Sequence, residues 1–249
     1  MITNCAFILP LVAFSFSLLA GPALAQQPFA AHSFSAHPSQ DGRCRGDTGR
    51  GDKDRSEKAC LEQLTGIATR QGESLRLTFQ DGSSRVYADR SAGCDQGEID
   101  DCVDYKVSGY FPKHGLLLIM IGYYEGVEWM LVRLDRGKET KMHVPPHYSP
   151  RENWLVSVCW SEGPAGCGNG IDIVPTVADQ AAREWHYEVP DKEYALYEFV
   201  GWDGEDRVKL NVTFRDGGGN FKTLPASVDR IVGRWRLKLP KEYRRAVRR

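Results

Sequence analysis

Short apolar runs separated by turn residues dominate the chain between Gly115 and Trp160. This stretch holds Leu116 to Ile121, the longest apolar run after the N-terminal segment. Short runs rich in β-branched and aromatic residues, bounded by turn residues or proline, are typical of buried antiparallel strands. The strands predicted here cover residues 116–124, 128–134, 140–144 and 154–160. We interpret them as one four-stranded meander, in which Pro145-Pro146 ends the third strand because proline donates no backbone hydrogen bond.

The same kind of pattern predicts β-structure on both sides of this stretch. Leu75, Leu77 and Phe79 alternate with polar residues before a turn at 81–83, which predicts a hairpin with residues 85–88. Later predicted strands cover residues 170–174, 185–187, 194–202, 208–214 and 231–239. A short helix is predicted over residues 56–64 with Ser56 as its N-cap. The fold class is therefore all-β, built of antiparallel meanders in a single domain, 56–239, with one short N-terminal helix.

A turn motif accompanies the central strands. Tyr148-Ser149-Pro150 precedes the strand at 154–160, and Trp202 to Arg207 leads into a later one as a second copy. The order of strands and turns resembles a blade of the TolB-like and WD40-like β-propeller families, which commonly carry an aromatic residue followed by Ser-Pro-Asp-Gly. Here Arg151-Glu152 stand in place of Asp-Gly. The resemblance implies a partial or small β-propeller-like fold, and a β-sandwich is the alternative.

The N-terminus has the features of a secretory signal peptide. Residues 1–25 carry no charge and end in Ala23-Leu24-Ala25, which predicts cleavage before Gln26. Nothing later approaches the run of about 18 apolar residues that marks a membrane span, so we expect no transmembrane segment. Residues 26–55 are rich in Ser, Pro, Gly and charge, which predicts a disordered leader. The sequence thus predicts a periplasmic or secreted protein.

Cysteine usage agrees with export. Cleavage removes Cys5 and leaves six cysteines, an even number suited to an oxidising compartment. Two loops are bracketed by cysteines eight residues apart, and both can turn back on themselves. The predicted disulfides are therefore sequential: Cys44 with Cys60, Cys94 with Cys102, and Cys159 with Cys167. A zinc site built from these cysteines would need thiolates at two-residue spacing, which is absent.

Candidate chemistry is sparse. His143 and His147 are four residues apart, but Pro145-Pro146 prevents the helix that would make this spacing a zinc site. Ser149 lies near His147 without a nucleophile-elbow motif or an identifiable third member of a triad. The carboxylates between Cys94 and Cys102 lack the spacing of a calcium loop, and a solvated loop is favoured over a cation site. We therefore assign no catalytic, cofactor-binding or metal-ligating residue.

Charge gives weak guidance about partners. The formal net charge is -1, which provides no general attraction to nucleic acid. The tail at 240–249 is basic, with five Lys and Arg residues against one Glu, and could hold an anionic surface. A solvated, frayed terminus is the favoured interpretation of this tail.

The functional prediction is an exported, non-catalytic binding module, without a cofactor, whose partner is a protein or a cell-envelope surface and not nucleic acid. A hydrolase that uses Ser149 and His147 is one alternative, and an envelope-associated structural protein is another. The sequence does not indicate the oligomeric state.

Overall fold

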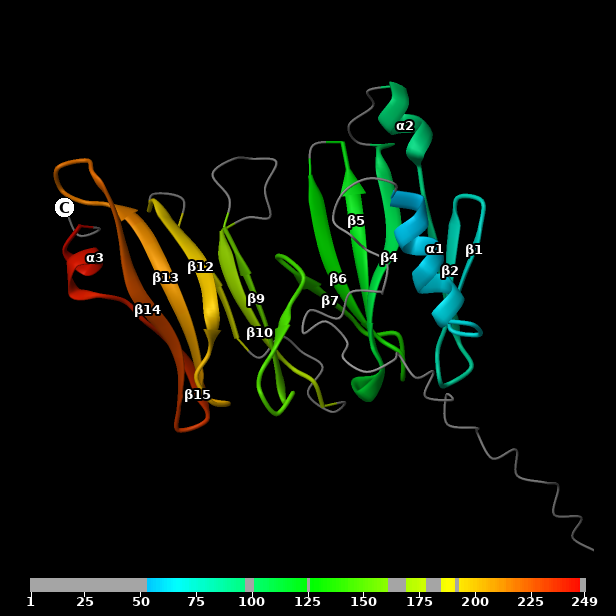
Figure 1. The fold of residues 1–249 in the computed structure, drawn as a ribbon. Helices are drawn as coiled ribbons and strands as arrows, with labels where there is room; N and C mark the ends of the chain where they lie inside the picture. The colour runs from blue at the N-terminus through cyan, green and yellow to red at the C-terminus, as the bar shows by residue number, and fades with distance from the viewer. Residues whose placement is uncertain are drawn as a thin grey trace, which may run out of the picture. The chain divides into compact units, whose positions relative to one another are not determined.

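The computed structural model describes residues 53–96, 101–124, 126–160, 169–177, 185–190 and 193–246. These residues all belong to one compact unit of the chain, 32–249. Four antiparallel sheets account for most of the described residues, which confirms the all-β class (Figure 1). The predicted signal peptide and most of the predicted leader lie outside the described residues.

The first two sheets take up the N-terminal half of the described chain. Sheet I contains β1 (Ala68–Gln71), β2 (Ser74–Thr78) and β3 (Ser84–Ala88). Sheet II contains β4 (Val103–Phe111), β5 (Leu116–Tyr123), β6 (Val127–Arg133) and β7 (Glu139–Met142). Within each sheet the strands lie side by side in chain order, so each sheet is a simple meander.

The last two sheets repeat this arrangement. Sheet III contains β8 (His147–Tyr148), β9 (Trp154–Cys159), β10 (Gly170–Pro175) and β11 (Trp185–Glu188). Sheet IV contains β12 (Ala195–Trp202), β13 (Arg207–Arg215), β14 (Phe221–Ile231) and β15 (Arg234–Lys238). Four short helices complete the described fold: α1 (Lys53–Gln63), α2 (Ser91–Gln96), η2 (Pro112–His114) and α3 (Lys241–Ala246).

Buried apolar side chains join neighbouring sheets. One cluster contains residues of sheets II and III, including Phe111, Leu131 and Leu155. A larger cluster joins the inner faces of sheets III and IV, where Trp154 packs edge to face against Trp235 with ring centroids 5.5 Å apart. Because each sheet buries one face against the next, residues of neighbouring meanders contact one another although they are far apart in sequence.

The predicted central meander contained one wrong strand and lacked another. The strand at 154–160 is β9 of sheet III, where it pairs with β8 and β10. The first strand of sheet II is instead β4, which pairs with β5 and was not predicted. Pro145-Pro146 does end the third predicted strand, but the chain then passes to a new sheet. The blade motif at 148–150 therefore begins in β8 and continues into the turn before β9, and these are the first two strands of sheet III, not the last two of one meander.

Helices lie near both ends of the described chain, and the first of them, α1, confirms the predicted N-terminal helix with an earlier start. Helix α1 begins at Lys53, inside the predicted leader, so Ser56 lies within the helix and is not its N-cap. Helix α3 occupies residues of the predicted frayed tail. Its Tyr243 is only 2% exposed, packs against Phe214, and donates a hydrogen bond to Glu193 Oε2 at 2.7 Å. The first half of the tail is therefore attached to sheet IV.

Candidate functional site

The described residues include four of the six cysteines that were predicted to form disulfides. Cys94 of α2 and Cys102 are bonded, with an S–S distance of 2.00 Å, which confirms this pairing. Cys60 and Cys159 are buried and disulfide-bonded as well. Cys44 and Cys167 lie outside the described residues, as do residues 97–100 of the acidic loop, so the other two pairings stay predictions.

Ser149 lies in the turn between β8 and β9, which hydrogen bonds to Glu205 hold in place. Its hydroxyl donates a hydrogen bond to Glu205 Oε2 at 2.8 Å and accepts one from the backbone N–H of Trp154 at 3.1 Å. The same Glu205 carboxylate, from the turn between β12 and β13, also accepts from Arg151 N and from Asn153 Nδ2 at 3.2 Å. The proton of Ser149 is thus directed to Glu205 and away from the role of a nucleophile activated by histidine.

His147 has a separate environment. Its ring stacks on Phe199 of sheet IV, with centroids 4.5 Å apart and ring planes 10° apart. This contact spans sheets III and IV, as the Ser149–Glu205 bond does. The two residues proposed for a hydrolase therefore each tie one sheet to the next, and their described contacts give that hypothesis no support.

The outer face of sheet IV carries the most distinctive surface of the described structure. Along β13 the residues Val208, Leu210, Val212 and Phe214 are buried, and the intervening residues point to the opposite face because strand side chains alternate. The pairing with β14 and β15 places their alternate residues on the same outer face. Six exposed basic side chains lie there and define what we name the basic face: Arg207, Lys209, Arg215, Arg234, Arg236 and Lys238.

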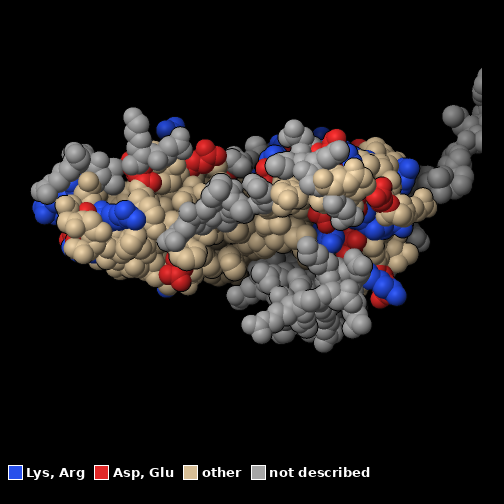
Figure 2. Space-filling view, turned by 90° about the horizontal axis from the view of Figure 1, so that it is seen from above, with Lys and Arg blue, Asp and Glu red and all other residues tan. Residues whose placement is uncertain are grey.

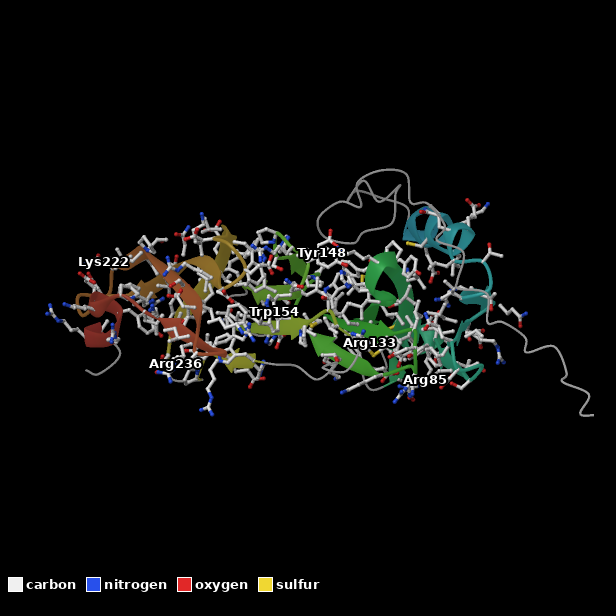
Figure 3. The ribbon with its side chains drawn as sticks, turned by 90° about the horizontal axis from the view of Figure 1, so that it is seen from below. Arg85, Arg133, Tyr148, Trp154, Lys222 and Arg236 are labelled. Carbon is white, nitrogen blue, oxygen red and sulfur yellow. A yellow bond between two sulfur atoms is a disulfide. The ribbon has the colours of Figure 1, made fainter. Side chains whose placement is uncertain are left out.

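Only two strand positions of this outer face carry acids, which leaves a net charge of +4 from six basic and two acidic side chains. They are Asp229 of β14 and Glu198 of β12, which accepts a hydrogen bond from Asn211 at 3.0 Å. Basic side chains are visible over sheet IV and α3 at the left of Figure 2, and Arg236 is labelled on sheet IV in Figure 3. The surface is therefore suited to an anionic partner.

Asp229 organises the centre of the basic face. Its carboxylate lies 3.1 Å (Oδ1) and 3.2 Å (Oδ2) from the Nε and Nη2 atoms of Arg207, and 2.5 Å from Lys238 Nζ. Burial tends to raise the pKa of this carboxyl, but the hydrogen bonds from Arg207 and Lys238 outweigh it and lower the pKa to about 2. The aspartate thus holds two cations in fixed positions on the sheet.

Exposed apolar groups border the basic face. Phe221 lies beneath the guanidinium of Arg215, which is 4.9 Å from that ring centroid and 5.2 Å from the centroid of Tyr194. At the hairpin between β14 and β15, Val232 is 96% exposed and has a φ of 48°, which is strained for a β-branched residue. A strained, exposed valine contributes little to the core, so its side chain is free to contact a partner.

Replacing Asp229 with Asn is expected to lower the free energy of unfolding by about 2 kcal/mol at pH 7. The reason is that folding lowers the pKa of the Asp229 carboxyl from 3.8 to about 2, so the folded state favours the charged form. Because the folded pKa is below the unfolded one, this stabilisation is complete above about pH 4 and is lost as pH falls toward 2. Denaturant unfolding at pH 7 and at successively lower pH measures it. Glu198→Gln is the control, with an expected change within about 0.5 kcal/mol. An Asp229→Asn difference that stayed constant with pH would contradict the ion-pair explanation.

A second polar group lies in the interior. Among the described residues, His143, Asp172 and His186 bring together nitrogen and carboxylate ligands suited to a metal ion, all within 4.8 Å of one another. In the sequence, His143 suggests a metal ligand only through its spacing of four residues from His147. Asp172 and His186 were missed because they meet through strand pairing in sheet III, for which no local signal exists.

A search of protein-family models finds no match to this chain, and no curated protein matches it either. Within the described part of the chain, no helix has the length and apolar character needed to cross a membrane.

Proposed function

We propose that the protein is an exported, non-catalytic binding module that attaches to an anionic cell-envelope surface through the basic face of sheet IV. The observation that carries this proposal is the set of six exposed cations on one sheet face. Lys and Arg near an anionic membrane surface each contribute about 1 kcal/mol of attraction, so the net charge of +4 on this face suffices for reversible attachment. Export follows from the predicted signal peptide and is compatible with the Cys94–Cys102 disulfide.

The hairpin tip favours a lipid headgroup layer as the anionic surface. Ile231 and Val232 are exposed beside Arg234, so cations and apolar side chains occupy the same edge. Proteins that lie on membranes combine basic residues with apolar side chains that enter the headgroup region. A purely electrostatic partner would not need the apolar tip.

The test uses mature protein, starting at Gln26, and vesicles with and without phosphatidylglycerol in a sedimentation assay. The double variant Arg234→Gln/Arg236→Gln removes two cations from the exposed edge strand. Its affinity for anionic vesicles is expected to fall about 30-fold, because about 2 kcal/mol of attraction is lost.

The matched control is Arg136→Gln/Lys138→Gln, which removes two exposed cations from the turn between β6 and β7 of sheet II. Its affinity is expected to remain close to that of the unaltered protein. Equal losses in the two double variants would show that only net charge matters, and an absence of vesicle binding by the unaltered protein would overturn the proposal.

A further inference from the structure

His143, Asp172 and His186 converge beside the inner strand β10 of sheet III, with His143 supplied by the connection between sheets II and III. Asp172 lies in the middle of β10, paired in register with His186 of β11 on one side and with Ser157 of β9 on the other. Residues directly opposite in a sheet share a face, so the side chains of Ser157, Asp172 and His186 form one polar row across three strands. His143 follows β7 and completes the group from outside the sheet.

The distances suit a small metal ion. Asp172 Oδ1 lies 2.7 Å from His186 Nδ1, and Asp172 Oδ2 lies 3.6 Å from His143 Nε2. Bonds of about 2.0–2.2 Å from zinc to nitrogen and oxygen place the ligands of a tetrahedral site about 3.3–3.5 Å apart. With one ligand atom from each residue, the three atoms lie within 4.8 Å of one another, so shifts of about 1–1.5 Å would bring them to ligand positions. The ion would replace the hydrogen now shared by His186 and Asp172.

The surroundings hold each ligand in place. His186 Nε2 contacts Glu188 Oε1 at 2.7 Å, which is the carboxylate–histidine arrangement that orients metal-binding imidazoles. Ser157 Oγ donates to Val144 O and accepts from Val144 N, each at 2.8 Å, and so anchors the segment that carries His143. A Cβ at Gly170 would overlap the His143 ring, so the glycine provides the space that the ring occupies.

Burial separates this group from an ordinary surface cluster. The Asp172 side chain is fully buried, and His143 and His186 are 13% and 25% exposed. A carboxylate in the interior of a sheet requires compensation by charge or by hydrogen bonds. Two imidazoles and one carboxylate are the ligand types that zinc uses when it keeps a fourth position for water or another ligand.

From these observations we propose that His143, Asp172 and His186 bind one divalent transition-metal ion, with Zn²⁺ as the representative ion. The site lies in sheet III and does not use the basic face, so it is a second binding function and does not depend on the first. Glu188 acts as a positioning residue through His186.

The test is calorimetric titration of metal-free mature protein, without a histidine tag, with Zn²⁺. One ion per chain is expected to bind, and His143→Ala is expected to weaken binding at least 100-fold. His147→Ala is the matched control and is expected to bind as the unaltered protein does. Glu188→Gln, an exposed substitution that leaves the interior intact, is expected to weaken binding about tenfold, as is typical of outer-shell partners.

Two further readouts separate binding at this site from adventitious binding. Co²⁺ in place of Zn²⁺ is expected to give the visible absorption of a four-coordinate ion, and this absorption is lost in His143→Ala. Circular dichroism shows whether each variant is folded. Equal Zn²⁺ affinity in the unaltered protein, His143→Ala and Glu188→Gln, or no binding by the unaltered protein, would overturn the proposal.

Discussion

Replacing Arg70 with Met is expected to lower the free energy of unfolding by about 3–5 kcal/mol, the cost typical of removing one partner from a buried ion pair. Arg70 of β1 contacts Glu57 of α1 at 2.9 Å and Asp89 at 2.6 Å. All three side chains are less than one-fifth exposed. Without Arg70, two mostly buried carboxylates would face each other with no cation between them.

The same group joins α1 and sheet I to sheet II. Arg70 donates to the backbone carbonyl of Tyr105 in β4, while Asp89 Oδ1 accepts from Tyr105 N at 2.9 Å. Glu57 Oε1 accepts from Val107 N, also in β4, at 3.1 Å. Loss of Arg70 therefore weakens the attachment of the N-terminal sheet as well as the ion pairs.

Arg76→Met provides the comparison for this variant. Arg76 lies in β2 of the same sheet, and its exposed guanidinium contacts Ser84 Oγ at 3.1 Å. The same chemical change at this exposed position is expected to alter stability by about 0.5 kcal/mol or less. Chemical denaturation of both variants decides the matter, and similar losses for the two would contradict the structural role assigned to Arg70.

The second large effect is expected for Glu205→Ala, with a loss of about 2–3 kcal/mol. Its carboxylate accepts hydrogen bonds from Ser149, Arg151 N and Asn153, and hydrogen bonds to a charged group contribute about 1.5–3 kcal/mol. Because Ser149 is buried, its hydroxyl would lose its acceptor without gaining full access to water.

Asp203→Ala tests whether this effect comes from the hydrogen bonds of Glu205 and not from any substitution in the same turn. Asp203 lies two residues away in the same turn and makes an exposed ion pair with Arg207 at 3.4 Å. Exposed pairs of this kind contribute about 0–1 kcal/mol, so a small change is expected. Equal losses of thermal stability in Glu205→Ala and Asp203→Ala would contradict the role of Glu205 in joining sheets III and IV.

Local patterns in the sequence predicted local structure well. The alternation of Leu75, Leu77 and Phe79 before a Gly-containing turn marks a hairpin, which the antiparallel pairing of β2 with β3 confirms. The apolar run after Gly115 marks β5, and the next predicted strand, at 128–134, marks its hairpin partner β6. Such hairpins are set by residues close in sequence, so a single sequence contains the information.

The assignment of strands to sheets could not be predicted from the sequence as well as the hairpins could. Pro145-Pro146 predicted the end of a strand, but nothing local shows that residues 154–159 pair with residues 170–175. The N-terminal helix was predicted, but α3 was not, because the burial of Tyr243 against sheet IV holds it in place. Contacts between distant segments decide both features.

The two candidate sites differ in the same way. The alternation of Arg234, Arg236 and Lys238 is visible in the sequence, but the tail beyond it carries a denser run of basic residues and is the stronger local signal. The burial of Trp235 between these residues is what places all three on one exposed face. The group proposed to bind metal had no such signal, since its three members come from three separate segments that only the fold brings together.

The salt dependence of vesicle binding tests the central claim, attachment to an anionic surface through the basic face, most directly. The Debye length falls from about 10 Å at 0.1 M salt to about 3 Å at 1 M, so exposed charges attract a surface much less at high salt. The mature protein is expected to sediment with phosphatidylglycerol vesicles at low salt and to be released near 1 M, while Arg234→Gln/Arg236→Gln is released at a lower concentration. Binding that is unchanged by salt, or that is equal for anionic and uncharged vesicles, would contradict the account.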